Sequence, residues 1–168
     1  YDVLRKVPKN LPYDKVAPHL RKPVFRVPCP YGEYASYAER FEKIFEAEIE
    51  SVGIDATYIY QHKRYLAGDF VEEIKQALEK TEEIKVILNK YRKEPLADDW
   101  LPIFIFDKDT FMDNVTNIRW DGDYGITYTN EKSEDVTIDL RKDFIVSLKW
   151  RVDWPMRWHK NKVDDENS

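Results

Sequence analysis

The sequence predicts an α/β fold with a small antiparallel β subdomain inserted between α/β elements. Three observations support this class: helix, glycine and strand patterns follow one another over residues 33–61, a second helical stretch covers 69–91, and short alternating strands fill 101–152. We therefore expect three parts, namely residues 1–95 with a helical extension, an inserted antiparallel subdomain at 96–148, and a return segment with a polar tail at 149–168.

The first predicted helix runs from about Glu33 to Val52. Its apolar side chains recur at helical spacing and form one face, and Gly53 then provides a stop: Tyr37, Phe41, Ile44, Phe45 and Ile49. After the glycine, residues 55–61 alternate with apolar or aromatic residues on both faces, which is typical of a buried strand. A helix followed by a glycine and such a strand is half of a crossover unit, so a parallel sheet is expected.

The second helical stretch begins with a candidate capping box. Asp69 stands at the expected N-cap and Glu72 follows three residues later. Apolar residues at helical spacing continue to about Tyr91, and the polar Thr81 interrupts them, which predicts a break or bend at that point.

Short strands are predicted from Trp100 onwards. Leu101 to Phe106 is an apolar run in which Pro102 favours an edge position or a late start. Alternating residues on both sides of 121–123 (Asp-Gly-Asp) predict a hairpin, and another alternating run predicts a strand through 136–140.

The first 30 residues contain six prolines and seven basic residues, so we expect an extended, wrapping loop without a long helix. Two interpretations stay open for its charge. The basic residues could contact a phosphate backbone, or they could be an ordinary solvated surface.

The composition narrows the function classes. Net charge is −5, which argues against a dedicated nucleic-acid module, and the single Cys29 excludes an internal disulfide and a cysteine-based zinc site. No apolar run is long enough for a membrane span, and one cysteine without a signal peptide is typical of a cytoplasmic protein. The chain starts at Tyr1 instead of Met, so we expect it to be an internal piece of a longer protein.

Residues 149–158 hold three of the five tryptophans, interleaved with charged residues. The alternation through residues 146–152 predicts a half-buried strand that Pro155 ends. Two interpretations stay open: a tryptophan-rich strand end that covers a core, or a pocket rim. In the second, carboxylates and tryptophan faces would suit an ammonium group, and the candidate set is Tyr1, Asp2, Asp153, Trp154 and Trp158.

Several segments, in order along nearly the whole chain, resemble class I lysyl-tRNA synthetases. The matching segments are Tyr1-Asp2-Val3-Leu4-Arg5-Lys6-Val7-Pro8, Val27-Pro28-Cys29-Pro30 with Gly32, Ser36-Tyr37-Ala38-Glu39, Ile87-Leu88-Asn89-Lys90-Tyr91-Arg92 and Trp150-Arg151-Val152-Asp153-Trp154-Pro155-Met156-Arg157-Trp158. The resemblance implies part of a Rossmann-type catalytic domain with a connective insertion. It also implies that the adenylate-forming signatures, of the His-Ile-Gly-His and Lys-Met-Ser-Lys-Ser types, lie outside this sequence.

The resemblance implies lysine-tRNA ligase activity, which consumes ATP, with Mg²⁺ expected, and transfers lysine to tRNA-Lys. No residue of this chain is expected to be catalytic. The implied lysine pocket contains Asp2, Asp153, Trp154, Arg157 and Trp158, and a weaker expectation places Arg5 and Lys6 against tRNA.

Two departures from the family pattern stand out. The Cys/His zinc ligands that some archaeal members carry in the insertion are missing, so no zinc is expected in this chain. Around Val163-Asp164-Asp165-Glu166 the preceding turn also differs. The partners implied are lysine, ATP, tRNA-Lys and the remainder of a synthetase chain, and the isolated chain is expected to be inactive. The alternative is a non-catalytic, stand-alone synthetase-like module for protein or RNA contact.

Overall fold

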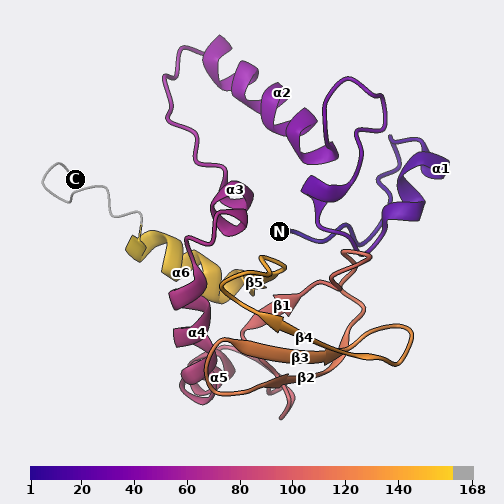
Figure 1. Ribbon diagram of the computed structural model, residues 1–168. Helices are drawn as coiled ribbons and strands as arrows, with labels where there is room; N and C mark the ends of the chain where they lie inside the picture. The colour runs from indigo at the N-terminus through magenta and orange to yellow at the C-terminus, as the bar shows by residue number, and fades with distance from the viewer. Residues whose placement is uncertain (161–168) are drawn as a thin grey trace, which may run out of the picture.

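The computed structural model describes residues 1–160, and Figure 1 shows a helical N-terminal part above two small antiparallel sheets flanked by helices. The helices are α1 (Tyr13–Val16), α2 (Tyr37–Ser51), α3 (Gln61–Leu66), α4 (Val71–Glu79), α5 (Thr81–Asn89) and α6 (Trp150–Lys160), with 3-10 turns η1 (Ala17–His19) and η2 (Val24–Arg26). The strands are β1 (Ile103–Ile105), β2 (Thr116–Trp120), β3 (Gly125–Thr129), β4 (Asp135–Asp139) and β5 (Val146–Leu148).

The N-terminal segment wraps as predicted, with short helical turns between its prolines. An isolated antiparallel bridge pairs Val3 with Pro23. Backbone bonds on either side of Leu4 fix this crossing, since its N–H donates to the Lys22 carbonyl at 2.9 Å and its carbonyl accepts from Arg21 at the same distance. A small separate core forms under the loop from Leu4, Leu11, Val16 and Val27.

Helix α2 has the predicted phase and stop. It begins later than expected because Ser36 caps it: the Ser36 hydroxyl accepts from the Glu39 N–H at 3.0 Å, and Glu39 in turn accepts from the Ala35 N–H at 2.8 Å. Gly53 follows the helix at φ +81°, a backbone conformation that glycine adopts without strain.

The predicted strand over 55–61 does not form a ladder in the described part of the chain. Residues 54–60 have no regular secondary structure, and α3 starts at Gln61. The expected parallel sheet is therefore wrong for residues 1–160, because every strand pair there is antiparallel.

The second helical stretch breaks where the sequence predicts. Lys80 separates α4 from α5, and the Thr81 hydroxyl turns back to donate to the Leu78 carbonyl at 2.8 Å. The predicted N-cap is wrong, because Phe70 and not Asp69 precedes α4. The Asp69 carboxylate instead lies 3.1 Å from the Arg64 guanidinium.

The strands of the predicted antiparallel subdomain form two separate sheets. β1 and β5 pair in one sheet, with Phe104 opposite Ser147, and β2, β3 and β4 form the other. The predicted hairpin is confirmed: β2 and β3 flank the turn, and the Asp121 carboxylate accepts from the Asp123 N–H at 2.8 Å.

One core unites the two sheets with α4 and the end of α3. Its largest fully buried members include Phe70, Phe106 and Tyr128. This core takes side chains from both sides of the boundary expected at residues 95 and 96, and the three-part division stays a prediction. None of the helices in residues 1–160 combines the length and apolar character that a membrane crossing requires.

The tryptophan-rich segment is a helix, and the predicted strand is wrong beyond Leu148. β5 ends there, and α6 begins at Trp150 after the single residue Lys149. Pro155 lies inside α6, where its missing N–H leaves the Arg151 carbonyl without a helical donor but does not end the helix. The polar tail and the segment around Val163 lie outside the described residues.

Candidate functional site

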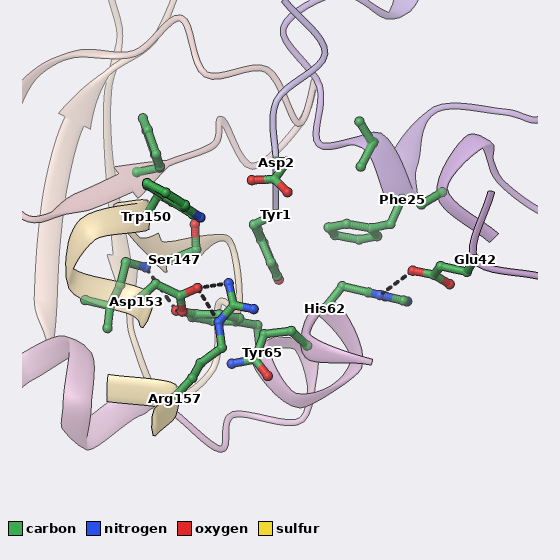
Figure 2. A pocket seen from close by; sticks show the side chains of 15 residues that line it. Tyr1, Asp2, Phe25, Glu42, His62, Tyr65, Ser147, Trp150, Asp153 and Arg157 are labelled. Atoms are coloured by element: carbon green, nitrogen blue, oxygen red, sulfur yellow. Dashed lines mark hydrogen bonds and ion pairs between the residues drawn. The ribbon is translucent and has the colours of Figure 1, made fainter. Parts of the chain in front are cut away.

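A cavity of about 180 Å³ opens between the N-terminal segment, α2, α3 and the β5–α6 junction. Figure 2 shows Tyr1 near its centre, with Trp150 and Asp153 on one side and Phe25 and His62 on the other. The lining residues are Tyr1, Asp2, Val24, Phe25, Ala38, Glu42, Gln61, His62, Tyr65, Phe104, Ser147, Leu148, Trp150, Asp153 and Arg157. Segments far apart in the sequence therefore meet at one hollow that is rich in carboxylates and aromatic rings.

Asp153 is the anchor of the α6 wall. Its side chain is buried, and its carboxylate accepts from the Tyr65 hydroxyl at 2.5 Å and from the Arg157 Nε at 2.6 Å, with a second bond from the same guanidinium. The Tyr65 hydroxyl also accepts from the Leu148 N–H at 3.2 Å. The Asp153 charge is thus already balanced by Arg157, one helical turn away.

Helical geometry decides which α6 side chains reach the cavity. Trp150, Asp153 and Arg157 are three and four residues apart, so they share one face and line the hollow. Trp154 and Trp158 lie further round, outside the lining set, and are 52% and 77% exposed. The Trp154 ring meets Trp150 edge to face at a centroid distance of 6.0 Å, so it supports the Trp150 ring from outside.

The opposite wall carries Glu42 and His62. The Glu42 carboxylate lies 3.6 Å from the His62 Nδ1, and Figure 2 shows the two side chains pointing toward each other. Burial raises the pKa of the Glu42 carboxyl, although nearby Lys63 opposes the shift. Burial also lowers the pKa of His62, so this imidazole is neutral at pH 7 and gives Glu42 no balancing charge.

Asp2 contributes a second carboxylate to the cavity. The backbone of Asp2 is fixed, because its carbonyl accepts from the Val24 N–H at 2.8 Å. Within residues 1–160 its exposed carboxylate has no ion-pair partner. In the described part of the chain, Asp2 and Glu42 therefore form no direct ion pair with a lysine or arginine, although Lys63 acts on Glu42 electrostatically.

The two residues expected at tRNA differ in their surroundings. Arg5 pairs with Asp113 at 2.5 Å, and Arg21 binds the same carboxylate at 3.0 Å. Lys6 is exposed on the same segment. Arg5 thus has a structural partner, whereas Lys6 is exposed on the surface.

The cavity does not fit the phosphates of ATP. The only cationic side chain in its lining is Arg157, which is bound to Asp153, and the acidic side chains there are Asp2, Glu42 and Asp153. A triphosphate needs free cations or convergent backbone N–H groups, so no step through ATP is assigned to these residues. Over residues 1–160, His, Cys, Asp and Glu side chains form no group of three placed to hold a metal ion.

Comparison with known proteins decides the family. The model of the family described as tRNA synthetases class I (K) matches residues 1–168. The chain belongs to this family. The lysine–tRNA ligase of Thermococcus kodakarensis is 42% identical over 170 residues, covering 99% of this chain and 32% of that protein. The mixed helical and antiparallel structure is consistent with part of a class I synthetase catalytic domain.

Other relatives carry the same name. The lysine–tRNA ligase of Pyrococcus horikoshii is 39% identical over 170 residues, covering 99% of this chain and 32% of that protein. That of Treponema pallidum is 38% identical over 166 residues, covering 97% of this chain and 31% of that protein. The synthetase chain described here therefore spans about a third of the length of these curated relatives.

Some of the residues that line this cavity were predicted from the sequence, and others were not. The structure places the predicted Asp2, Asp153 and Arg157 at one cavity, as it does Tyr1. It adds Glu42, His62, Tyr65 and Trp150, which the pattern did not single out as site residues. In the sequence, Glu42 has the pattern of a solvent-exposed acidic residue on a helix. The one signal for its partial burial is its position beside the apolar residue Phe41 of α2.

Proposed function

We propose that this synthetase chain is part of a cytoplasmic lysine-tRNA ligase, which activates lysine with ATP and Mg²⁺ and transfers it to tRNA-Lys. The family match over residues 1–168 carries this proposal, and the names of the relatives support it. The chemistry of adenylate formation is assigned to sequence outside this chain. The 168 residues alone should not support lysine-dependent exchange of pyrophosphate into ATP.

We also propose that the cavity is the lysine pocket. An ammonium group needs a desolvated anion and an aromatic face, and both are available here. Glu42 and Asp2 supply negative charge that is not held in a direct ion pair with a lysine or arginine of residues 1–160, while Trp150 supplies a ring at the lining. An arriving ammonium would relieve the cost of burying the Glu42 charge.

Asp153 and Arg157 take a different role in this pocket from the one expected. Because the Asp153 carboxylate already binds Arg157 and Tyr65, it holds α6 in position and does not meet the ligand as a free anion. Trp154 remains a predicted pocket residue, now as a support for Trp150, and Trp158 remains a prediction at the outer edge.

The test uses a chimera in which this chain replaces the matching third of the Thermococcus kodakarensis relative. Lysine binding is measured by titration calorimetry and activity by lysine-dependent pyrophosphate exchange. Losing a cation–π contact of about 1–2 kcal/mol should weaken lysine binding roughly tenfold in Trp150→Ala. Glu42→Gln should weaken it comparably.

Tyr91→Ala is the control, because it removes an aromatic ring that is 81% exposed and lies outside the cavity lining. Its lysine affinity should stay within about twofold of the parent. Equal losses in Trp150→Ala and Tyr91→Ala would contradict the pocket assignment. A folded chimera without lysine-dependent exchange would contradict the proposed activity.

A further inference from the structure

Three polar side chains of the cavity lie around one hub, the hydroxyl of Tyr65. This hydroxyl binds the Asp153 carboxylate and the Leu148 N–H, and so joins α3 to α6 and β5. The three side chains come one from each of these elements, and all of them line the cavity. We call them the polar wall: Gln61 of α3, Ser147 of β5 and Arg157 of α6.

Ser147 contributes a buried hydroxyl. The residue directly precedes Leu148 and lies opposite Phe104 of β1, so its side chain lies on the cavity side of the two-stranded sheet. It is only 2% exposed, yet within residues 1–160 the hydroxyl makes no hydrogen bond. A buried hydroxyl without a partner is unfavourable, so a ligand that bonds to it removes that cost.

Gln61 contributes an amide. It precedes Tyr65 by one helical turn, so the two side chains share the face of α3 that lines the cavity. The amide nitrogen Nε2 is shielded from solvent and has no hydrogen-bond partner in the described part of the chain. The terminal torsion of a glutamine is soft, so a rotation of the amide group alone brings Nε2 to the cavity.

Arg157 contributes a donor beside its ion pair. Its Nε and Nη2 atoms bind the Asp153 carboxylate, whereas Nη1 makes no hydrogen bond to any described residue. The side chain is 35% exposed, so a ligand can reach it. The pair also places a positive and a negative charge side by side at this wall, which matches a ligand group that carries both charges.

These groups match the head of a free amino acid. Its α-carboxylate accepts hydrogen bonds, for which Gln61 and Arg157 have donors, and its α-ammonium donates them, for which the Ser147 hydroxyl is an acceptor. Figure 2 shows Ser147 and Arg157 on the side of the cavity away from Glu42. A ligand with a second ammonium at the end of a long side chain can thus meet polar groups on both sides.

We propose that the polar wall binds the α-carboxylate and α-ammonium groups of lysine, with Gln61 and Ser147 as specificity-determining residues. The inference rests on the proposed lysine pocket and adds the direction of the ligand. The head lies against α3 and β5, and the side-chain ammonium points to Glu42 on α2. A simple amine or a simple acid would use only part of the wall.

Three ligands, titrated by calorimetry into the chimera with the Thermococcus kodakarensis relative, separate the contacts of the wall. Lysine has both head groups, ε-aminocaproate lacks the α-ammonium, and cadaverine lacks the carboxylate. Gln61→Met should weaken the binding of lysine and ε-aminocaproate about tenfold and leave that of cadaverine within about twofold. Ser147→Ala should weaken lysine and cadaverine to the same extent and spare ε-aminocaproate.

Gln76→Met is the matched control, because Gln76 is exposed on α4 and lies outside the cavity lining. It should change none of the three affinities. Removing a hydroxyl that has no partner should not lower stability, so Ser147→Ala should melt at the temperature of the parent. The assignment is overturned if lysine binding is unchanged in both wall variants, if each variant weakens all three ligands equally, or if Ser147→Ala melts well below the parent.

The pocket and the wall are read separately. All three ligands keep the distant ammonium, so Glu42→Gln should weaken all of them alike. If it does so while the wall variants fail to discriminate between the ligands, the pocket is supported and the polar wall is wrong. If Glu42→Gln affects none of them while the wall variants discriminate as stated, the ammonium site is wrong and binding of the head by the wall is supported.

Discussion

Replacing Tyr65 by phenylalanine tests whether one hydroxyl holds the cavity wall to the core. Tyr65 is 5% exposed, and its hydroxyl joins two elements by donating to Asp153 at 2.5 Å and accepting from the Leu148 N–H at 3.2 Å. The variant keeps the ring but leaves a buried N–H without a partner and removes one bond from a carboxylate. These two effects together predict a loss of about 3 kcal/mol in the free energy of unfolding.

Urea unfolding followed by fluorescence measures this loss, and an unchanged m-value would show that the denatured state is unaffected. Tyr128→Phe is the matched control, because the buried Tyr128 hydroxyl also accepts from a backbone N–H (Lys108, 2.8 Å) and donates to an aspartate (Asp107, 3.3 Å). Both variants should lose similar stability, but only Tyr65→Phe should also weaken lysine binding in the chimera. A loss below about 0.5 kcal/mol in Tyr65→Phe would refute the bridging role.

Three further predictions concern charge and backbone. Because burial raises the pKa of Glu42, its ionised form costs stability, so Glu42→Gln should melt higher at pH 7 and little differently at pH 4. Asp107 is the opposite case, because burial opposes its ionisation but hydrogen bonds from Thr110 outweigh burial and lower its pKa. Asp107→Asn should therefore be less stable than the parent at pH 7, and the difference in stability between the two proteins should disappear below about pH 4 in acid titrations. In Gly68→Ala the added Cβ would lie 2.7 Å from the Phe144 ring, and the residue has φ +81°. This variant should lose about 2 kcal/mol of unfolding free energy in urea, whereas Gly53→Ala, whose Cβ would meet no atom within 4 Å, should lose about 1 kcal/mol.

Local signals predicted the elements that depend only on nearby residues. The phase of α2 and its stop at Gly53 came from apolar spacing and a glycine, and the β2–β3 hairpin came from the Asp121-Gly122 turn. The break between α4 and α5 was likewise visible at Thr81. Each of these features carries its own geometry in a few consecutive residues.

The failures occurred where distant partners decide the structure. Residues 146–152 alternate like a strand, but β5 ends after Leu148, and Asp153 finds its partners Tyr65 and Arg157 only if the chain turns into a helix at Trp150. The segment 54–60 has a strand pattern, yet a strand needs neighbours that residues 1–160 do not provide.

The site was predicted in part for the same reason. The sequence pointed to Asp2, Asp153 and Arg157 because they fall in distinctive segments at the two ends of the chain. It gave no signal that separates Glu42 from the other acids of α2. The sequence pointed to Trp154 as the aromatic residue of the pocket, but Trp150 lines the cavity instead. The difference arises because successive side chains turn by about 100° in a helix, whereas they alternate between two faces in a strand.

The two walls of the cavity are anchored unequally. Lys149 alone separates α6 from β5, and its N–H donates to the Pro102 carbonyl at 2.7 Å, so the wall with Trp150 is tied to the β1–β5 sheet. The wall with Glu42 belongs to α2, whose own apolar face is uncovered. A ligand that spans both walls must therefore order α2 as it binds. Any contact that orders α2 beforehand would raise ligand affinity, and the ligand would strengthen that contact by the same factor.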